Sequence, residues 1–338
     1  MQIDAGVNLK PYNTFGLPAV AKTLVRITSD ADVRRVVDDR KLGRAPKFIL
    51  GGGSNIILTR DMPQVVLKVE VRGMRIVEER ADAVIVEAGA GESWHDFVAF
   101  TLEQGCPGLE NLALIPGTVG AAPVQNIGAY GVELKERFES LDAVDLVTGR
   151  SVTLGPQICA FAYRDSVFKH SLAGRSLITR VRFRLPRPWR PVLGYVELQK
   201  KIAESGIVSP DARQICDWVC AIRRAKLPDP ALVGNAGSFF KNPVVTPEQC
   251  RDIIGRDPEI VHYPMPDGSV KLAAAWMIDA CGWKGKSVGQ AGVYERQALV
   301  LVNRGAAIGS EVMTLSRAIQ ESVYGRFGIR LEHEPVVM

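Results

Sequence analysis

One long run rich in small side chains, from Ile115 to Gly131, constrains this chain more than any other feature. It reads Ile-Pro-Gly-Thr-Val-Gly-Ala-Ala-Pro-Val-Gln-Asn-Ile-Gly-Ala-Tyr-Gly. Backbone of this composition can approach a large flat or phosphorylated ligand closely and present its N–H groups to it. We expect a loop without secondary structure here, and a structureless loop this long inside a compact protein is normally functional. We therefore expect the run to line a binding site.

The first glycine-rich loop of the chain, Gly51-Gly52-Gly53-Ser54-Asn55, follows a short predicted strand at Lys47 to Leu50. Such turns expose several N–H donors that can hold a pyrophosphate. A structural turn explains this loop equally well when it is taken alone. Neither the GxGxxG spacing of a Rossmann unit nor a P-loop lysine is present, which disfavours both common nucleotide motifs. Together with the run from Ile115 to Gly131, this loop favours one large dinucleotide that lies across both segments.

Length and composition limit the classes of protein to consider. A chain of 338 residues with 46% hydrophobic and 23% charged residues is typical of a globular protein with two or three domains. The net charge of +5 is modest and its Lys and Arg are scattered, which argues against nucleic-acid binding and suits anionic small molecules. No secretory signal and no apolar stretch long enough for membrane insertion is visible, so we expect a cytoplasmic protein. The six Cys lack metal-ligand spacing and the four His do not cluster, so we expect free thiols and no metal.

Hydrophobic periodicity and capping residues predict an α+β fold with short strands. An antiparallel hairpin is expected around Asp142 to Leu154, and a basic strand with a solvated face around Arg180 to Arg190. The other main predicted elements are strands at Thr23 to Ile27, Lys47 to Leu50, Val65 to Val71, Ala83 to Glu87 and Ala298 to Val302, and helices at Asp30 to Arg40, Trp94 to Gln104, Tyr195 to Glu204, Asp211 to Arg224, Leu272 to Ala280 and Ser310 to Tyr324.

A third motif, the decapeptide Gly234 to Pro243, reads Gly-Asn-Ala-Gly-Ser-Phe-Phe-Lys-Asn-Pro. Its glycines allow a tight turn, and Phe239 and Phe240 would anchor the turn in a core, so that Ser238 could be held rigidly at a cleft. Taken alone, an ordinary turn whose hydroxyl caps its own backbone explains the motif more simply.

In their chain order of Gly51 to Asn55, Ile115 to Gly131 and Gly234 to Pro243, these three motifs resemble the UDP-N-acetylenolpyruvoylglucosamine reductase family, which is also called the UDP-N-acetylmuramate dehydrogenase family. The resemblance covers essentially the whole chain, and the decapeptide and the run Pro123 to Gly131 are its most specific parts. Pro191 to Tyr195 further resembles the subgroup with a tyrosine-bearing loop. The remaining resembling stretches are Asn13 to Gly16, Tyr163 to Ser166, Gln297 to Leu299 and Leu331 to Glu334.

The resemblance implies a two-part FAD-binding domain of the vanillyl-alcohol-oxidase (PCMH) type plus a separate α+β substrate-binding domain. We expect FAD-binding subdomains at 1–70 and 71–225, a substrate-binding domain at 226–326, and a return of 327–338 to the second subdomain. It also implies non-covalent FAD, NADPH as the reductant and a monomer. The cofactor-binding residues that the resemblance implies are Gly51, Gly52, Gly53, Ser54, Asn55, Ile115, Pro116, Gly117, Thr118, Gly120, Gln125, Asn126, Ile127 and Gly128.

The family's reaction is the reduction of UDP-N-acetylglucosamine enolpyruvate to UDP-N-acetylmuramate in peptidoglycan precursor biosynthesis. By resemblance, Ser238 donates the proton, Arg164 holds the substrate carboxylate and Glu334 stands across that carboxylate. The residues implied to hold the nucleotide sugar are Tyr195, Lys226, Asn242 and Gln297.

Simpler explanations exist for several of these residues. Arg164 beside Asp165 would, without the family, be a surface ion pair, and Lys226 a linker lysine. Family members commonly continue after the matching Glu with Val and a basic residue, whereas Pro335 follows Glu334 here and lacks a backbone donor. Glu332 is the alternative acid, although alignment of Leu331 favours Glu334.

Two other functions stay open at this point. Another FAD-dependent oxidoreductase of the same superfamily, such as an alcohol or amine oxidase, often attaches its flavin through a His or Cys near the first glycine loop. None lies between Lys47 and Asp61, which disfavours that function. A non-enzymatic flavin- or nucleotide-binding module would keep the glycine-rich loops but need not keep Arg164, Ser238 and Glu334 together.

Overall fold

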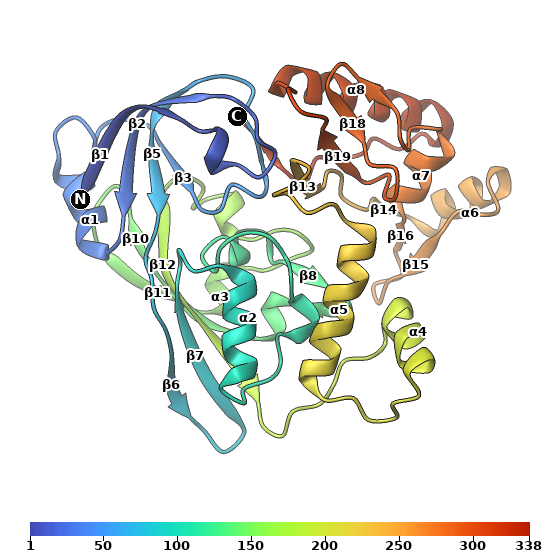
Figure 1. Cartoon of the computed structure of the whole chain (residues 1–338), viewed down its shortest axis with the longest axis horizontal. Coiled ribbons are helices and arrows are strands. Elements are labelled where there is room, and N and C mark those ends of the chain that lie inside the picture. Colours follow the sequence, from blue (N-terminus) through green and yellow to red (C-terminus); the bar gives the residue numbers. More distant parts are fainter. The chain divides into compact units, whose positions relative to one another are not determined.

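The computed structural model describes residues 1–338, which divide into two compact units. Both units mix helices and strands, so the predicted α+β class is confirmed (Figure 1). Unit 1 comprises Met1–Val7, Val20–Gly53 and Met62–Ala225, and unit 2 comprises Asn8–Ala19, Ser54–Asp61 and Lys226–Met338. The division into three domains stays a prediction.

The first sheet of unit 1 has the strand order β1-β2-β5-β3, in which β5 pairs in parallel with both β2 and β3. Helix α1 (Asp30–Asp38) connects β2 to β3, and the Ser29 hydroxyl caps it by accepting from the Asp32 amide. The strands are β1 (Gln2–Asn8), β2 (Val20–Ile27), β3 (Lys47–Leu50) and β5 (Met62–Val69). Because parallel strands end at the same edge, the glycine loop after β3 starts at the carboxyl end of this sheet.

The second sheet of unit 1 is antiparallel, in the order β11-β10-β12-β7-β6. Its strands are β6 (Met74–Glu79), β7 (Ala83–Gly89), β10 (Phe138–Asp145), β11 (Ser151–Leu154) and β12 (Ser176–Pro186). The smaller elements of unit 1 are helices α2 (Trp94–Glu103), α3 (Pro156–Cys159), α4 (Val196–Ser205) and α5 (Ala212–Lys226), 3₁₀ helices at Glu110–Leu112, Ala122–Gln125, Leu134–Glu136 and Val167–Lys169, and the hairpin β8 (Gly128–Ala129) with β9 (Val132–Glu133).

An aromatic cluster fixes α2 in the core of unit 1. Trp94 and Phe97 of α2 pack against Phe183 of β12, with ring centroids 5.6 and 5.1 Å from the Phe183 ring. All three side chains are fully buried. Aromatic pairs of this kind contribute about 0.5–1.5 kcal/mol each beyond their area of burial. The indole of Trp94 also donates to the carbonyl of Leu112 at 2.8 Å, which positions the chain just before the glycine-rich run.

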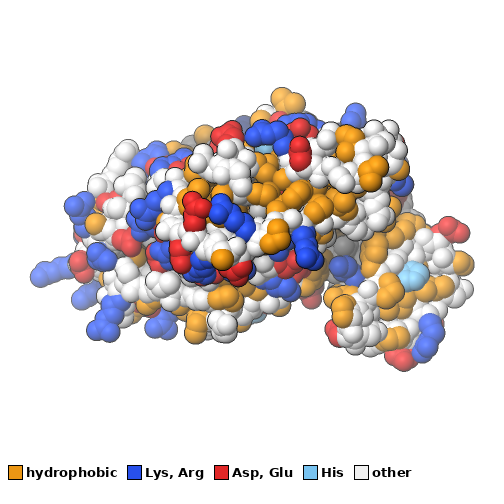
Figure 2. Space-filling model, turned by 90° about the horizontal axis from the view of Figure 1, so that it is seen from below, with side chains coloured by type: hydrophobic (Ala, Val, Ile, Leu, Met, Phe, Trp, Pro, Cys, Tyr) orange, Lys and Arg blue, Asp and Glu red, His pale blue; other side chains and the backbone are white.

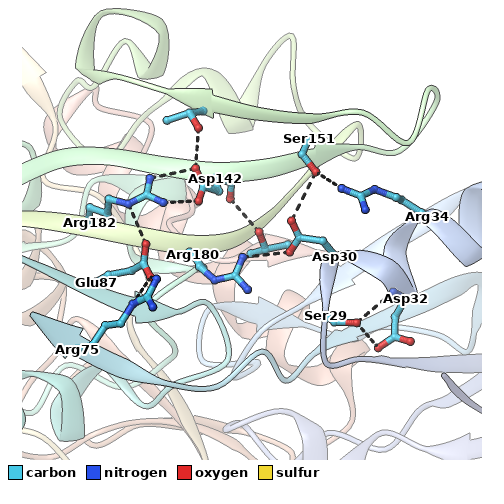
Figure 3. A network of polar contacts seen from close by, with 12 residues as sticks. Ser29, Asp30, Asp32, Arg34, Arg75, Glu87, Asp142, Ser151, Arg180 and Arg182 are labelled. Atoms are coloured by element: carbon cyan, nitrogen blue, oxygen red, sulfur yellow. Dashed lines mark hydrogen bonds and ion pairs between the residues drawn. The ribbon is translucent and has the colours of Figure 1, made fainter. Parts of the chain in front are cut away.

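Charged side chains form a ladder across four strands of the antiparallel sheet (Figure 3). Arg182 of β12 binds Asp142 of β10, with Nη1 3.0 Å from Oδ1, and Glu87 of β7, with Nε 2.8 Å from Oε2. Arg75 of β6 extends the ladder with two bonds to Glu87, of 2.8 and 3.0 Å. The predicted basic strand is thus confirmed as β12, and its Arg182 is paired with carboxylates of both neighbouring strands. Arg180 pairs instead with Asp30 of α1.

Unit 2 contains two small sheets, three helices and a two-stranded pairing near the chain's end. One sheet has the antiparallel order β13-β19-β18-β17 and the other β14-β16-β15. The strands are β4 (Ile56–Ile57), β13 (Asn235–Ser238), β14 (Val244–Val245), β15 (His262–Pro264), β16 (Val270–Leu272), β17 (Ser287–Val288), β18 (Ala291–Val293), β19 (Val300–Asn303) and β20 (Val336–Val337), and the helices are α6 (Pro247–Arg256), α7 (Ala274–Ala280), α8 (Gly309–Phe327) and the 3₁₀ turn Lys10–Tyr12.

The end of the chain is a parallel partner of β4. Val336 and Val337 of β20 pair with Ile56 and Ile57 of β4, and the Met338 amide donates to the Ile57 carbonyl at 2.9 Å. The residues just after the first glycine loop therefore hold the C-terminal segment within unit 2.

The surface matches the scattered charge of the sequence. On the face in Figure 2, Lys and Arg are intermixed with Asp and Glu, and hydrophobic side chains gather between them. No helix has the length and apolar character needed to cross a bilayer.

Most predicted elements are confirmed, with small shifts at their ends. The helix predicted from Leu272 begins at Ala274, because Leu272 belongs to β16 and its amide donates to the Pro243 carbonyl. The expectation of a structureless run at 115–131 is wrong in part, since a 3₁₀ helix and strand β8 lie within it. The first strand, β1, was not predicted because only its partners in the sheet stabilise it: none of its side chains is fully buried.

Candidate active site

The two glycine-rich segments meet inside unit 1. A Cβ on Gly52 would lie 3.0 Å from the Gly117 Cα, and a Cβ on Gly51 would lie 2.8 Å from the Thr118 hydroxyl. Only glycine permits this approach of two backbones. Lys68 of β5 supports the loop by donating to the Gly51 carbonyl at 2.7 Å, and burial lowers the pKa of its ammonium. The structure therefore brings together the two loops that the sequence assigns to one ligand.

Thr118 presents a buried hydroxyl at this junction that no protein group satisfies. Buried polar atoms nearly always have a partner, so an orphaned hydroxyl between two glycine loops calls for one from outside the chain. A pyrophosphate oxygen is a suitable acceptor for a hydroxyl and for backbone N–H groups alike. The donor set at Gly51, Gly52 and Thr118 thus fits the phosphate portion of FAD.

The middle of the run is held by its own side chains. Asn126 adopts the left-handed conformation, with a φ of 43°, and is fully buried. Its amide donates to the Ala162 carbonyl at 3.0 Å, and its Oδ1 accepts from the Lys135 amide at 2.9 Å. The Ser166 hydroxyl donates to the Val124 carbonyl at 2.6 Å. Asn126 shapes the loop here, and a direct contact of its side chain with the cofactor stays a prediction.

Arg164 lies beside the same run with an unusual backbone. Its φ of 55° is rare for a residue with a side chain, and such strain gathers at functional sites. Its guanidinium donates to the Gly128 carbonyl at 2.8 Å, while Asp165 pairs with His170 at 2.7 Å. The simple explanation of an Arg164–Asp165 surface pair is therefore wrong. The guanidinium is instead directed to the end of the glycine-rich run.

Two tyrosines and a buried arginine form a cluster next to this run in unit 1. The ring of Tyr195, which precedes α4 and is 41% exposed, lies edge-on to Tyr130 with centroids 5.0 Å apart. Burial raises the pKa of Tyr130, whose hydroxyl also has Arg223 of α5 as a hydrogen-bond partner. Arg223 Nε donates to the Leu114 carbonyl at 3.2 Å, and burial lowers the pKa of its guanidinium. Tyr195, a predicted substrate residue, therefore packs against a tyrosine that has Arg223 as a hydrogen-bond partner.

Ser238 ends strand β13 in unit 2, and its position follows from the decapeptide. Gly237 has a φ of +69°, and its amide donates to Asn235 Oδ1 at 2.9 Å. Asn235, not Ser238, thus makes the local cap of this turn, so the self-capping explanation of the serine is not needed. Phe239 and Phe240 are fully buried, which confirms the predicted anchor and fixes the half-buried Ser238 beside them.

Glu334 lies against the residues that follow Ser238. Its amide donates to the Phe239 carbonyl at 2.9 Å, and its carbonyl accepts from the Asn55 side chain at 3.2 Å. The amides on both sides of Pro335 are hydrogen-bonded, because the Glu334 amide donates to the Phe239 carbonyl and the Val336 amide donates to the Asn55 carbonyl at 3.0 Å. The missing donor of Pro335 therefore leaves this pairing intact. Glu332, the alternative acid, is exposed and pairs with Lys241 at 3.1 Å, whereas Glu334 is half-buried.

The other predicted substrate residues lie in unit 2 with partners of their own. Asn242 Oδ1 accepts from the Ala274 amide at 3.0 Å and so caps α7, whose own N-cap, Ala273, has no polar side chain. Gln297 Oε1 accepts from the Leu299 amide at 3.3 Å in the turn before β19. Lys226 is the last residue of α5. Their contacts with a nucleotide sugar stay predictions.

The predicted residues thus fall into two groups. Unit 1 holds Gly51 to Gly53, the run from Ile115 to Gly128, Arg164 and Tyr195, and unit 2 holds Ser54, Asn55, Lys226, Ser238, Asn242, Gln297 and Glu334. Within unit 2, Ser238 and Glu334 lie on paired segments. Within unit 1, Arg164 and the glycine-rich run are in direct contact.

The chain is similar to known proteins over nearly its whole length. Residues 21–155 match the model of an FAD-binding domain, and residues 229–338 match that of the UDP-N-acetylenolpyruvoylglucosamine reductase C-terminal domain. The chain is 57% identical to the UDP-N-acetylenolpyruvoylglucosamine reductase of Azoarcus sp. strain BH72, over 99% of this chain and 98% of that protein. It belongs to the UDP-N-acetylenolpyruvoylglucosamine reductase family.

Further relatives agree with this assignment. The reductase of that name from Burkholderia vietnamiensis is 56% identical over 98% of this chain and 95% of its own. The crystal structure of the Thermus caldophilus enzyme superposes with a TM-score of 0.67 and 24% identity, over 100% of this chain and 99% of that one, and shows the same fold. The predicted family and the FAD-binding fold with a separate C-terminal domain are thereby confirmed. The chain is an FAD-dependent oxidoreductase of this family.

Sequence reasoning did not single out Tyr130, Arg223 or His333 as individual site residues. Tyr130 stood inside a recognised run, but nothing in the sequence marks its contact with Tyr195. Arg223 is one of two adjacent arginines on α5, and only the fold shows that its guanidinium is buried. His333, which the structure pairs with Phe240 in an antiparallel bridge, is one of four histidines that do not cluster in the sequence.

Proposed function

We propose that this protein reduces UDP-N-acetylglucosamine enolpyruvate to UDP-N-acetylmuramate, with NADPH as the reductant, in the synthesis of peptidoglycan precursors. The observation that carries the proposal is the 57% identity, over nearly the whole length of both chains, to a reductase named for this substrate. The two meeting glycine loops and the orphaned Thr118 hydroxyl support it independently, because they fit the diphosphate of a dinucleotide.

Bound FAD would supply the hydride chemistry that links NADPH to the terminal carbon of the enolpyruvyl ether. This step leaves carbanion character on the carbon next to the substrate carboxylate. Gly51, Gly52, Gly53, Thr118 and the backbone of the run around Gly117 to Gly120 would hold the cofactor's phosphates.

Arg164 would bind the substrate carboxylate and stabilise the charge that develops on it. A guanidinium suits this role because it stays charged and presents a fixed fork of donors. Its Nη2 already donates to the Gly128 carbonyl, so the side chain is oriented before substrate binds. A donor that is oriented beforehand needs no reorganisation when charge develops in the transition state, and its electrostatic stabilisation is therefore more effective.

Ser238 would donate the proton to the carbon next to the carboxylate. A hydroxyl is a weak acid, but a nascent carbanion is a strong base, so a rigidly held hydroxyl suffices. Glu334 would stand across the carboxylate, because its backbone pairs with the residue after Ser238. Tyr195, Lys226, Asn242 and Gln297 would bind the nucleotide sugar. A monomer in the cytoplasm is the setting that the sequence predicts.

Steady-state kinetics test this function. NADPH oxidation should depend on the enolpyruvyl UDP-sugar, and purified protein should be yellow and release FAD on denaturation. One shared cleft for two diphosphate ligands predicts parallel lines in the initial-rate plot and inhibition at high substrate concentration. If the rate of NADPH oxidation is independent of the sugar and oxygen is reduced instead, the result would support another oxidoreductase of the superfamily.

A further inference from the structure

The C-terminal segment that carries Glu334 is fastened to helix α8 by two side chains. His333 Nε2 lies 2.7 Å from the Ser316 hydroxyl, and Gln320 Nε2 donates to the Leu331 carbonyl at 2.7 Å. Ser316 and Gln320 stand one turn apart on α8, so they face the segment together. Ser316 is fully buried, and His333 is its hydrogen-bond partner.

The imidazole of His333 also packs against the residues that follow Ser238. Its ring centroid lies 5.4 Å from that of Phe239 and 5.6 Å from that of Phe240. Phe240 and His333 are directly paired as an antiparallel bridge. The side chain of His333, the residue next to Glu334, therefore contacts both α8 and the serine-bearing segment.

We propose that Ser316 and His333 act as a positioning pair, which sets Glu334 in register with Ser238 for the reaction proposed above, on which this inference rests. Neither residue is a catalytic residue. The pair acts through the backbone, because the Glu334 amide donates to the carbonyl of Phe239, the residue directly after Ser238. A displacement of His333 would therefore move Glu334 relative to the serine.

The hydrogen bond is what distinguishes this pair from ordinary core packing. An apolar residue at 333 could fill the space between the phenyl rings but would leave the buried Ser316 hydroxyl without a partner. Burial lowers the pKa of His333, which favours the neutral ring that can share one proton with a hydroxyl. The orientation of the imidazole is thus set by its hydrogen bond with Ser316 as well as by its packing against Phe239 and Phe240.

The test uses holoenzyme with FAD bound and separates two half-reactions by flavin absorbance. Ser316→Ala removes the hydroxyl, and His333→Ala removes the ring. Both should reduce their flavin with NADPH at the wild-type rate, while reoxidation by the enolpyruvyl UDP-sugar slows by about tenfold or more, since small misplacements of reacting groups have effects of this size. Ser322→Ala, the same change on α8 at a hydroxyl that bonds only within the helix, should leave both rates unchanged.

A double-mutant cycle with Glu334→Gln decides whether the effect passes through Glu334. If it does, Ser316→Ala should change the reoxidation rate of the Glu334→Gln enzyme by less than about twofold, because coupled residues are not additive. An equal loss in both backgrounds, or no loss in Ser316→Ala alone, would overturn the positioning role. If His333→Ala does not fold, the milder Ser316→Ala carries the test. A wild-type enzyme whose flavin the sugar cannot reoxidise refutes the proposed function itself, and this inference with it.

Discussion

The side-chain amide of Asn55 donates a hydrogen bond to the backbone carbonyl of Glu334, two residues that are 279 positions apart in the chain. Asn55 ends the first glycine-rich loop, and Glu334, near the C-terminus, is the residue proposed to stand across the substrate carboxylate. The Glu334 amide also donates to the Phe239 carbonyl, and β20 pairs with β4. These contacts hold Glu334, the end of the loop and the serine-bearing segment together within unit 2.

Replacement of the proposed proton donor should separate the two half-reactions. Ser238→Ala should retain FAD and reduce it with NADPH at the wild-type rate, while reduction of the sugar falls by about 10²–10⁴-fold, the usual contribution of general acid catalysis. Stopped-flow absorbance of the flavin follows both steps. Ser310→Ala, an exposed serine at the start of α8, is the matched control. Loss of both half-reactions in Ser238→Ala would instead indicate a role in folding.

A methyl group on the first glycine loop should impair cofactor binding. In Gly52→Ala, the new Cβ would lie 3.0 Å from the Gly117 Cα, so the two loops must separate. The ratio of flavin to protein absorbance after gel filtration should drop markedly. Gly325→Ala is the control, because nothing lies within 4 Å of its added Cβ, and alanine in a helix stabilises by up to about 1 kcal/mol. Full flavin content in Gly52→Ala would contradict the proposed cradle.

The orphaned hydroxyl of Thr118 makes a separate prediction about affinity. Thr118→Val removes a buried hydroxyl that has no partner in the protein, so the apoprotein should be as stable as wild type or more stable. If the hydroxyl binds a phosphate of FAD, the loss of a hydrogen bond to a charged group should weaken FAD binding by about 1.5–3 kcal/mol. Flavin fluorescence titration and thermal unfolding of the apoprotein measure the two quantities. An unchanged FAD affinity would show that the hydroxyl has no contact with the cofactor.

The charge ladder of unit 1 should appear in the acid dependence of stability. Burial alone would raise the pKa of Asp142, but its hydrogen bonds with Arg182 and Thr153 outweigh burial and hold the pKa below its usual value. A carboxyl group whose folded pKa is depressed contributes stability above its unfolded pKa and loses that contribution as pH falls through the folded value. Asp142→Asn should therefore lower the free energy of unfolding by about 1–3 kcal/mol at pH 7.

The difference between Asp142→Asn and wild type should shrink as the pH falls below about 4, where wild type also loses the carboxylate. Urea unfolding at several pH values measures it. Asp38→Asn, which removes an exposed carboxyl at the end of α1, is the matched control for the loss of one negative charge. A constant difference down to pH 2 would mean that packing, not charge, explains the loss.

The sequence predicted the loops of this site better than their contacts. Gly51 to Gly53 and the run around Gly117 stand out because only glycine tolerates such backbone approaches, and this signal is local. The strand Arg180 to Arg190 was predictable from its alternation, but its partners were not. Pairing of Arg182 with Asp142 and Glu87 depends on the register of three strands, which no single segment encodes.

Long-range pairing also explains why the sequence did not predict the contact between His333 and Ser316 near Glu334. A half-buried histidine near a C-terminus has no periodic or spacing signal, and Ser316 looks like any serine on a helix. Their contact exists because β20 pairs with β4 and draws the C-terminal segment past Phe240. The sequence also left open whether Pro335 disturbs the position of Glu334. The structure shows that the pairing continues beyond the proline, because the Val336 amide donates to the Asn55 carbonyl.

A single-turnover experiment tests the central claim most directly. The FAD of the wild-type enzyme is reduced anaerobically with one equivalent of NADPH and then mixed with UDP-N-acetylglucosamine enolpyruvate. The proposed function predicts rapid recovery of the oxidised flavin spectrum, with one equivalent of UDP-N-acetylmuramate formed per flavin. A flavin that stays reduced in the presence of the sugar would contradict it.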